Sequence, residues 1–542
     1  MTRVHVIGNI AGNIRSLVNA LEAVGVEVAW ITTPEDISSA KIVILPGVGN
    51  FGHCVRELAT SGLLTPLRKY IEKGNPFLGI CVGMQVLFDG SEEDASIAGL
   101  GILSGSLKRF DDRSKSVPHI GWSTVMSNSS DVSASLGQFY FVHSFKLSLP
   151  WNKSNDTNGW EVLKASYYEE DFVAGVHRGA VLATQYHPEK SGVLGLKFLR
   201  EFLINATLLS LSLAEQRTIT TMKKPTCRVI ACLDVREDDN GTLVVTKGDS
   251  YDVRSHTSDG NVRNVGDPVR MAQAYYESGA DEIVFLNITS FRRPPAENSP
   301  TLELLEKVSR SVFVPLTIGG GIVDFPLPDG SIESAFNVAR RYFSAGADKV
   351  SIGSDAVYAA EKYWRNGAKP DGTSSIEAIA KAYGNQAVVV SIDPRKQYVK
   401  ASVATEHTTF PASPYGPEGE ECYWYQCTTK GGREGSDLDV VQLARAVQHL
   451  GAGEILVNSI DNDGKNMGFD LQLLSLIKRS VQIPVIASSG AGKPQHFVDA
   501  FEQTTVDAAL GAGMFHRGDF TVQDVKSSMH NAGLPVRQTV AL

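Results

Sequence analysis

The stretch GADEIVFLNIT at residues 279–289 returns as GAGEILVNSID at residues 451–461, and the sequence around each copy is echoed as well. GGGI at residues 319–322 corresponds in the same way to SGAG at residues 489–492. Each copy is a short apolar run that passes into glycine or polar residues, which is typical of a buried strand and the loop after it. A repeat of this kind indicates two fused halves of similar structure.

From Arg228 onward, short and nearly continuous apolar runs alternate with helix-like segments. The runs are RVIACLDV, EIVFLNIT, VPLTIGGGI, KVSIGSDAV, AVVVSIDPR, EILVNSIDNDG, PVIASSGAG and AALGAGMF. Strands buried on both faces belong to parallel sheets, and βα units in this number close into a barrel. The sequence therefore predicts a (β/α)8 TIM barrel, with residues 325–333, 363–374 and 406–426 as added loops or hairpins.

The first part of the chain has a different pattern of apolar and helical segments. Apolar runs such as VHVI (residues 4–7) and IVILPGVG (residues 42–49) alternate with helical patterns. This βαβ order predicts a parallel-sheet α/β domain with helices on both faces. The polar segment that follows shows no strand alternation. We therefore place the α/β domain at residues 1–206, a linker at 207–223 and the barrel at 224–542.

The composition limits the classes of function. The 542 residues include 51 Lys and Arg against 60 Asp and Glu, so no basic excess is available to attract nucleic acid by counterion release. Six cysteines are too few for a disulfide scaffold in a chain of this length. Neither a signal-peptide pattern nor a run of about 18 apolar residues is visible. We expect a cytoplasmic monomer whose domains act in cis, without nucleic-acid or membrane partners.

A cysteine motif and a histidine motif carry the chemistry of the first domain. GICVG at residues 79–83 places Cys81 between glycines where a strand passes into a helical segment, which is the pattern of a nucleophile elbow. QYHPE at residues 185–189 follows another strand-like run and supplies a base and a carboxylate. His187 would take the thiol proton while Glu189 orients the imidazole. A buried structural cysteine and a surface histidine are the alternatives for each motif taken alone.

Together these motifs resemble those of the class I glutamine amidotransferases, over nearly all of residues 1–206. In that family the cysteine attacks the carboxamide of glutamine. The resemblance implies an oxyanion loop at Pro46 to Asn50, including Gly47 and Gly49, whose backbone N–H acts together with that of Val82. It also implies the following glutamine-binding residues: Gln85, Glu93, His143, Ser144 and Phe145. At Gly8-Asn9 the chain departs from the family, where an acidic residue is usual.

Two aspartates directly follow apolar runs of the predicted barrel. Asp234 closes the first strand and Asp393 closes the fifth. Because TIM-barrel active sites lie at the C-terminal ends of the strands, we expect the two side chains to face one another across the mouth. Carboxylates on opposite sides of a substrate suit general acid and general base catalysis. A helix cap is the alternative role for each.

Glycine-rich turns follow the third, fourth, seventh and eighth runs. Turns of this kind ahead of helices bind phosphate through backbone N–H groups. The residues predicted to contact phosphate are Gly320, Gly321, Gly353, Ser354, Gly490, Ala512 and Gly513. Since the repeat places turns on opposite rims of the barrel, the sequence predicts a long substrate with two phosphate groups.

These features resemble the cyclase subunit of the imidazole glycerol phosphate synthase family, and the whole chain is similar to the single-chain members found in fungi and plants. The resemblance implies that glutamine-derived ammonia converts phosphoribulosyl formimino aminoimidazole carboxamide ribotide (PRFAR) to imidazole glycerol phosphate and the ribotide AICAR. It implies that Lys247, within VVTKGD, contacts PRFAR and that Asn458, Asp463 and Gly464 line the pocket near the second phosphate. Asn287 stands where many bacterial relatives have Asp, so we assign it no proton transfer.

Charged residues also stand at the N-terminal starts of barrel strands, away from the predicted substrate: Arg228, Glu282, Lys349 and Glu454. Ammonia becomes non-nucleophilic ammonium in water, so it must pass unprotonated from the glutaminase into the barrel. We predict that these residues form a closed ring of salt bridges, and the family resemblance implies that the ring gates an ammonia channel. Stabilisation of the barrel is the alternative. The chemistry calls for no cofactor and no metal.

Other functions are weighed against this one. An amidotransferase that feeds an ATP-dependent amination would need an adenylating or P-loop domain, and G-x-x-x-x-G-K-[ST] is absent from the sequence. The family resemblance implies a reaction of the histidine pathway. The sugar-isomerase barrel of that pathway shares the half-barrel repeat but has no use for ammonia. An inactive scaffold would have lost its site residues, whereas Cys81, His187, Glu189, Asp234 and Asp393 are all present.

Overall fold

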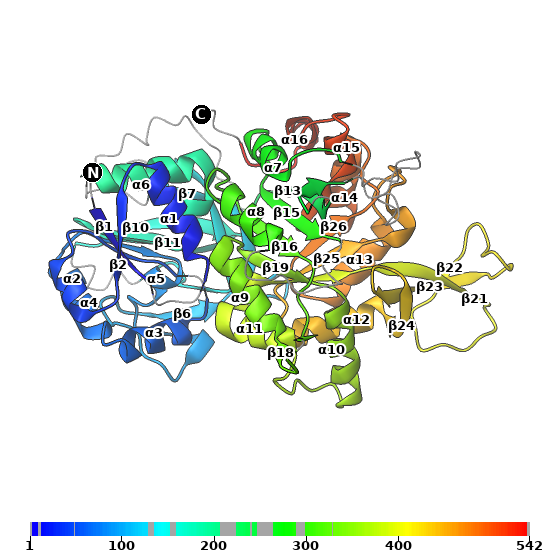
Figure 1. The fold of residues 1–542 in the computed structure, drawn as a ribbon, viewed down its shortest axis with the longest axis horizontal. Coiled ribbons are helices and arrows are strands. Elements are labelled where there is room, and N and C mark those ends of the chain that lie inside the picture. The colour runs from blue at the N-terminus through cyan, green and yellow to red at the C-terminus, as the bar shows by residue number, and fades with distance from the viewer. Residues whose placement is uncertain are drawn as a thin grey trace.

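The structure of the chain is a computed structural model, in which an α/β unit lies beside a barrel (Figure 1). It describes residues 3–8, 12–47, 49–127, 135–151, 159–205, 224–238, 241–246, 264–288, 299–327 and 329–538. Asn9, the linker predicted at 207–223 and Lys247 lie outside the described residues. The domain boundaries therefore stay a prediction.

A nine-stranded sheet forms the centre of the first unit, in the order β2-β1-β3-β4-β12-β11-β10-β7-β8. The strands are β1 (Arg3–Ile7), β2 (Glu27–Ile31), β3 (Val43–Leu45), β4 (Phe77–Ile80), β7 (His119–Ser127), β8 (Ser135–His143), β10 (Glu161–Tyr167), β11 (Glu170–Arg178) and β12 (Val181–Thr184). From β2 to β12 the strands are parallel, as the sequence predicts, and the remaining pairs are antiparallel. The direction alternates there because short turns, such as Tyr168-Glu169, join consecutive strands without a crossover helix.

The helices of this unit lie on both sides of the parallel half of the sheet (Figure 1). They are α1 (Ile14–Ala23), α2 (Pro34–Ser39), α3 (Phe51–Thr60), α4 (Leu64–Glu72), α5 (Val82–Gln85) and α6 (Gly192–Asn205). Polar side chains begin several of them: Asn13 caps α1 and Asn50 caps α3 by accepting a hydrogen bond from a backbone N–H of the first turn.

The second unit is the predicted barrel, and all the predicted runs are strands. They are β13 (Arg228–Glu237), β15 (Glu282–Asn287), β16 (Leu316–Gly319), β19 (Lys349–Ile352), β20 (Val388–Ile392), β25 (Glu454–Asn458), β26 (Val485–Ser488) and β27 (Ala508–Gly511). The strands are parallel, and β13 pairs with both β15 and β27, which closes the barrel. Alternate residues face inward, where Ile230, Val389 and Leu456 belong to a small interior cluster separate from the layer under the helices.

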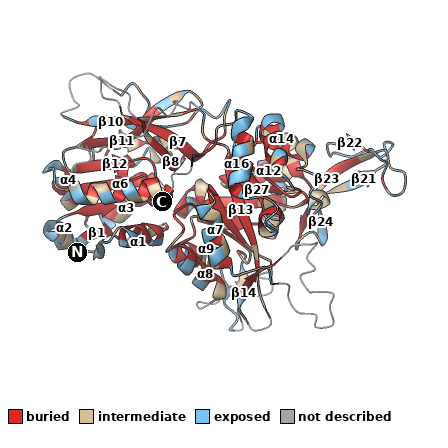
Figure 2. Ribbon diagram, turned by 90° about the horizontal axis from the view of Figure 1, so that it is seen from above, coloured by how far each residue is buried: buried red, intermediate tan, exposed pale blue. Residues whose placement is uncertain are grey.

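Helices surround the barrel, as the alternating pattern requires. They are α7 (Pro268–Glu277), α8 (Pro300–Val308), α9 (Ala335–Ala345), α10 (Ser354–Arg365), α11 (Ser375–Tyr383), α12 (Val440–Leu450), α13 (Leu471–Ser480), α14 (Pro494–Thr504), α15 (Gly513–His516) and α16 (Val522–Asn531). In Figure 2 most strands of the central sheet and of the barrel are buried, while the outer sides of the helices are exposed.

The added stretches of the barrel are loops and hairpins, as predicted. β17 (Phe325–Pro326) and β18 (Ile332–Glu333) form a short hairpin. The largest addition is a four-stranded antiparallel sheet that projects from the barrel (Figure 1). Its strands are β21 (Pro394–Val399), β22 (Phe410–Pro411), β23 (Cys422–Thr429) and β24 (Glu434–Asp439).

The β7–β8 hairpin joins the two units. Ile120, Trp122 and Tyr140 on this hairpin belong to the hydrophobic core of the barrel and not to that of their own unit. Contacts around the hairpin extend the junction: the Arg537 guanidinium lies 4.2 Å from the centre of the Trp122 ring. Because the hairpin buries apolar side chains against the barrel, the glutaminase-like unit covers the end at which the barrel strands start.

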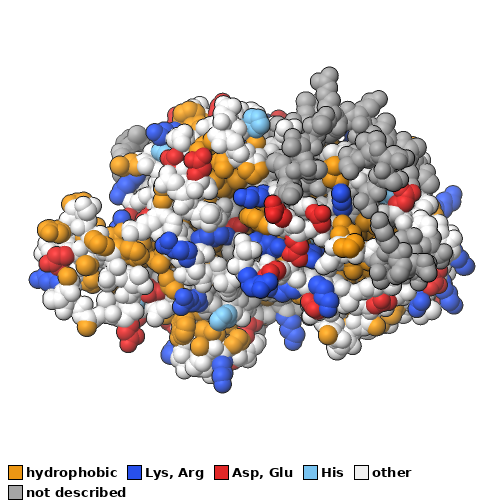
Figure 3. Space-filling model, turned by 180° about the vertical axis from the view of Figure 1, so that it is seen from behind, with side chains coloured by type: hydrophobic (Ala, Val, Ile, Leu, Met, Phe, Trp, Pro, Cys, Tyr) orange, Lys and Arg blue, Asp and Glu red, His pale blue; other side chains and the backbone are white. Residues whose placement is uncertain are grey.

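On the face shown in Figure 3, Lys and Arg side chains are interspersed with Asp and Glu side chains. This mixture agrees with the near balance of charges in the sequence. Among the described residues, no helix is long and apolar enough to cross a membrane.

Candidate active sites

Cys81 stands at a strained corner between β4 and α5. Its backbone has φ 52° and ψ −105°, a conformation that residues with a Cβ rarely adopt. The glycines on either side make the corner possible, since a Cβ at Gly83 would lie 2.2 Å from the Leu45 carbonyl oxygen and one at Gly79 would lie 2.5 Å from the Gly83 carbonyl oxygen. The predicted nucleophile elbow therefore has the expected geometry.

A buried histidine and carboxylate lie beside this corner. His187 Nδ1 is 2.7 Å from Glu189 Oε1, and both side chains are buried. Burial alone would lower the pKa of His187, but Glu189 and Cys81 raise it well above its ordinary value. The hydrogen bond and charge of Cys81 contribute to this shift, so the imidazole is placed to exchange a proton with the thiol.

Gln185 is a contact of Cys81 that the sequence analysis did not assign. Its Nε2 lies 3.4 Å from Cys81 Sγ, and its Oε1 lies 3.1 Å from Gln85 Nε2. The signal was available, because Gln185 opens the same QYHPE motif that contains His187 and Glu189.

The predicted oxyanion loop packs against the elbow. A Cβ at Gly47 would lie 2.4 Å from the backbone nitrogen of Gly83, so only glycine fits there. Gly49 has φ 133°, again a glycine conformation. The Gly47 carbonyl accepts a hydrogen bond of 3.4 Å from Val82 N–H, the group predicted to bind the oxyanion. In this arrangement the Val82 donor is occupied.

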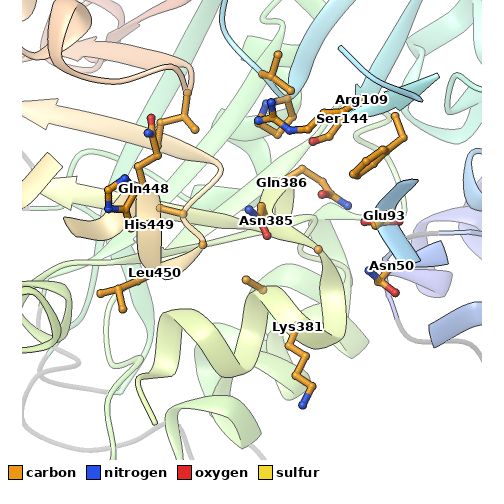
Figure 4. Close-up of a pocket in the computed structure, with 18 of the residues that line it drawn as sticks. Asn50, Glu93, Arg109, Ser144, Lys381, Asn385, Gln386, Gln448, His449 and Leu450 are labelled. Carbon is orange, nitrogen blue, oxygen red and sulfur yellow. The ribbon is translucent and has the colours of Figure 1, made fainter. Parts of the chain in front are cut away.

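A cleft between the two units opens beside these groups (Figure 4). Its volume is about 650 Å³. From the glutaminase-like unit it is lined by Glu93, Ser144 and Phe145, which are predicted glutamine-binding residues, and by Asn50 and Arg109. The barrel side contributes Lys381, Asn385, Gln386, Gln448 and His449. Burial raises the pKa of Glu93 to about 7, although a hydrogen bond of 2.7 Å from Phe51 N–H opposes the shift.

Two other predicted glutamine-binding side chains are turned into the core. His143 is buried, and its Nδ1 lies 2.8 Å from the Phe145 carbonyl oxygen. Gln85 is also buried, and its Nε2 donates a hydrogen bond of 3.3 Å to the same oxygen. Neither side chain lines the cleft. Their direct contact with glutamine stays a prediction.

At the mouth of the barrel, both predicted catalytic aspartates have perturbed carboxyl groups. Burial raises the pKa of Asp234 to about 7, and the charge of Asp463 contributes to the shift. Burial also raises the pKa of Asp393, while hydrogen bonds from Ser391 and Asn458 oppose this change. Carboxyl groups whose pKa is raised in this way suit acid and base catalysis.

A cavity of about 190 Å³ lies at this mouth. Predicted residues gathered around it are Asp234, Asn458, Asp463, Gly464, Gly490, Ala512 and Gly513. His516 and Arg517, which the sequence analysis did not assign, line it as well. Asp393 and the predicted phosphate turn residues of the other half, Gly320, Gly321, Gly353 and Ser354, do not line this cavity.

Glycines shape the predicted phosphate turns of that other half. Gly320 and Gly321 follow β16 with φ 107° and 73°. Gly353 precedes the first turn of α10 and has open space around its Cα, since no atom lies within 4 Å of the place where a Cβ would stand. Ser354 Oγ accepts a 2.8 Å hydrogen bond from Lys430 N–H of the projecting sheet, a contact that sequence spacing does not reveal.

At the opposite end of the barrel, the predicted ring of charges is closed and buried. Arg228 binds Glu282 at 3.0 Å and also pairs with Glu454. Lys349 binds Glu282 at 2.6 Å and Glu454 at 2.7 Å. Burial alone would raise the pKa of Glu454, but Arg228 and Lys349 lower it. Thr317 Oγ1 adds a 2.7 Å hydrogen bond to Glu282.

The glutaminase-like unit lies against this ring. A Cβ at Gly121 of β7 would be 3.9 Å from Arg228 Cδ. Lys190, one residue after Glu189, forms a 2.6 Å salt bridge with Asp348, which precedes Lys349. This ion pair connects the end of the histidine motif to the start of the strand that carries Lys349 of the ring.

Two remaining predictions concern single residues and metals. Asn287 Nδ2 donates a 3.0 Å hydrogen bond to Thr301 Oγ1, which agrees with a structural role. Within the described ranges, no group of three or more His, Cys, Asp and Glu side chains could hold a metal ion.

Comparisons with known proteins cover both sites. The family model described as "Glutamine amidotransferase class-I" matches residues 5–206, and that described as "Histidine biosynthesis protein" matches residues 228–521. Imidazole glycerol phosphate synthase hisHF of Emericella nidulans is 52% identical over 550 residues, which cover 99% of each chain. The protein of the same name from Schizosaccharomyces pombe is 51% identical over 522 residues, 95% of this chain and 96% of the relative. The chloroplastic protein of Arabidopsis thaliana is 48% identical over 531 residues, 97% and 88% of the two chains.

Proposed function

The chain belongs to the imidazole glycerol phosphate synthase family, and on that premise we propose how its residues divide the reaction. It is an enzyme that couples a class I glutaminase to a cyclase of histidine biosynthesis. The observation that carries the proposal is the order of the parts: thiol site, buried ring of charges and acidic barrel mouth follow one another through the molecule.

In the glutaminase, Cys81 attacks the carboxamide carbon of glutamine. His187 takes the thiol proton at Nε2 and gives it to the departing ammonia, and Glu189 holds the ring. Water then hydrolyses the Cys81 thioester with His187 as base, which releases glutamate and restores the thiol. Glutamine enters through the cleft beside Glu93, Ser144 and Phe145. The oxyanion needs the Val82 N–H, which donates to the Gly47 carbonyl in this structure. The peptide group that carries the Gly47 carbonyl must therefore rotate before Val82 N–H can bind the oxyanion. We therefore expect slow hydrolysis when the barrel is empty.

Ammonia then crosses the ring into the barrel interior. The ring separates the glutaminase from an interior lined by apolar side chains such as Ile230 and Leu456. An apolar interior suits neutral ammonia and disfavours ammonium, because an unpaired charge is costly to bury. If Lys349 moved away from Glu282 and Glu454, the ring would open and ammonia could pass through it.

At the mouth, Asp234 acts as general acid and Asp393 as general base. The glycine-rich turns hold the two phosphates of PRFAR, with Asn458, Asp463 and Gly464 near the second one. The raised pKa of Asp234 supports its role, since a carboxyl with a pKa of about 7 is available in protonated form at neutral pH. Ring closure with ammonia gives imidazole glycerol phosphate and AICAR and releases the water that glutamine hydrolysis consumed.

A glutaminase assay with and without PRFAR tests the proposal most directly. We expect glutamate to form slowly with glutamine alone and much faster when PRFAR is added, with imidazole glycerol phosphate produced in parallel. Glutamate formation that ignores PRFAR, or PRFAR consumption without an imidazole product, would contradict it.

We also propose that the two domains act in cis within a monomer in the cytoplasm. The six unpaired thiols suit a reducing compartment. Light scattering tests the first point and imaging of the tagged protein tests the second.

Gly353→Ala is expected to weaken PRFAR binding while leaving glutamine hydrolysis intact. The structure makes it a better test than Gly490, where a Cβ would lie 2.2 Å from the Gly468 carbonyl oxygen and disturb the fold whatever the ligand. Gly353 has φ −104°, outside the left-handed region, and open space where a Cβ would stand, so alanine should fit there without disturbing the fold.

For Gly353→Ala we expect KM for PRFAR to rise by roughly ten- to a hundredfold, because the new Cβ would stand in the open space before the turn and keep the phosphate from the backbone N–H groups. Glutamine hydrolysis measured without PRFAR should match the wild type. An unchanged KM for PRFAR would remove this turn from the phosphate site.

Lys349→Ala is expected to uncouple the two reactions. Removing the lysine opens the ring, so ammonia escapes or is protonated before it reaches the barrel. The quantity to measure is glutamate formed per imidazole glycerol phosphate, which should rise above about one, while cyclisation with ammonium salts changes little.

Because Lys349→Ala leaves Glu282 and Glu454 with less compensation, its melting temperature is measured alongside. Thr317→Val, which removes a hydroxyl hydrogen bond to Glu282 but no charge from the ring, is the matched control and should keep the ratio near one. A ratio unchanged in folded Lys349→Ala would return the ring to a purely structural role.

A further inference from the structure

A row of hydrogen bonds runs through the core of the glutaminase behind the cleft. His119 of β7 lies opposite His143 of β8, and His119 Nδ1 is 3.3 Å from His143 Nε2. Ser123 Oγ is 3.1 Å from His119 Nε2, and His143 Nδ1 is 2.8 Å from the Phe145 carbonyl oxygen. The mechanism described above makes no use of His119 or Ser123.

Chemistry fixes the direction of these bonds. The Phe145 carbonyl can only accept, so His143 carries a proton on Nδ1. Burial lowers the pKa of His143 to about 3 and that of His119 well below its ordinary value, so both rings are neutral. His143 Nε2 is then an acceptor, His119 must donate from Nδ1, and His119 Nε2 accepts from the Ser123 hydroxyl. Each histidine has one allowed tautomer.

The row continues to the nucleophile. Gln85 Nε2 donates to the Phe145 carbonyl oxygen at 3.3 Å and to Gln185 Oε1 at 3.1 Å. Gln185 Nε2 lies 3.4 Å from Cys81 Sγ. The Phe145 carbonyl is therefore shared by a bond from the histidine side and a bond from the thiol side. The two bonds together fix the position of this oxygen, so a displaced His143 ring would shift the oxygen relative to Gln85.

We propose that His119, held by Ser123, is a positioning residue for glutamine hydrolysis. Through His143 it fixes the Phe145 backbone and the Gln85 amide, and with them the wall of the cleft next to Cys81. His119 itself is fully buried and does not line the cleft, so it acts only through these neighbours. The inference rests on the glutaminase function proposed above.

His119→Phe tests the proposal. Phenylalanine keeps the ring contacts with Tyr167 and Phe141, whose centres lie 4.1 and 5.1 Å from that of His119, but lacks both nitrogens. We expect KM for glutamine to rise by roughly tenfold, the scale of a lost buried hydrogen bond, with a smaller change in kcat. Cyclisation of PRFAR with ammonium salts should stay at the wild-type rate.

His119→Asn is the conservative rescue. The asparagine amide nitrogen can stand near the position of Nδ1 and donate to His143, so KM for glutamine should return most of the way to the wild-type value. Tyr167→Phe is the matched control, because it removes a buried 2.7 Å hydrogen bond to the Ser116 carbonyl in the same aromatic cluster but outside the row. It should lower the melting temperature without changing KM.

A spectroscopic measurement keeps the proposal testable if His119→Phe does not fold. In wild-type protein labelled with ¹⁵N-histidine, both His119 and His143 should show neutral rings protonated on Nδ1. An Nε2 proton on either ring overturns the proposal, as does a wild-type KM for glutamine in folded His119→Phe. Failure of the wild-type enzyme to hydrolyse glutamine, with or without PRFAR, would instead contradict the proposed function.

Discussion

Cys81→Ala is expected to abolish product formation from glutamine while cyclisation with ammonium salts continues. The thiol is the only group at the elbow that can form the covalent intermediate, and the triad acts as a unit, so glutamine-dependent turnover should fall by on the order of 10⁴-fold or more. The barrel needs only ammonia. The measurement is imidazole glycerol phosphate formed from PRFAR with each nitrogen source.

Cys54→Ala is the matched control for this change. Cys54 lies in α3, and burial raises the pKa of its thiol to about 12, so it is a structural cysteine of the same unit. Its removal should leave glutamine-dependent turnover near that of the wild type. Glutamine-dependent activity that survives in Cys81→Ala would show that the nucleophile is assigned to the wrong residue.

Asp234→Asn and Asp393→Asn are expected to stop cyclisation with either nitrogen source. Asparagine has nearly the shape of aspartate but cannot transfer the proton, so each change should cost on the order of 10² to 10⁴-fold in kcat, the usual contribution of one positioned acid or base. Glutamate formation without PRFAR should continue. The measurement is PRFAR consumption with ammonium salts and with glutamine.

Asp437→Asn, an exposed aspartate of β24, controls for the substitution itself and should be silent. Near wild-type turnover in both Asp234→Asn and Asp393→Asn would leave these carboxylates as structural groups. Loss in one variant alone would assign the proton transfers to that residue and another group.

The stability of Asp234→Asn provides a separate check on the burial of the carboxyl group. Because burial raises the pKa of Asp234, the folded protein holds this proton more tightly than the unfolded chain does, and wild-type stability falls as the pH rises towards about 7. Asparagine carries no such penalty. The melting temperature of the variant relative to wild type should therefore be higher at about pH 8 than at about pH 5. An equal difference at both values would argue against the raised pKa.

The sequence predicted features that depend on neighbouring residues. The barrel strands could be identified because an unbroken apolar run that ends in Gly or Asp is typical of a buried parallel strand, and this pattern lies within a few consecutive residues. GICVG predicted the elbow because the steric demand that Gly79 and Gly83 meet is imposed within a few residues. The antiparallel half of the first sheet was not anticipated, since strand direction there depends on turns such as Tyr168-Glu169, which have no strong sequence signature.

The candidate site divides in the same way. Motifs placed Cys81, His187 and Glu189 together, and position along the strands led to the four charges of the ring. The Lys190–Asp348 ion pair between the glutaminase and the barrel could not be predicted, because those residues are far apart in sequence and lie on different units.

Sequence by itself predicted which groups react and determined the order in which the two family segments follow one another, because residue type and local spacing carry both. Only the tertiary structure decided which groups share a hydrogen bond. Val82 N–H is occupied by the Gly47 carbonyl, and His119 meets His143 across paired strands, because backbone packing brings distant atoms within bonding distance. Such contacts form from the whole fold, and no local pattern encodes them.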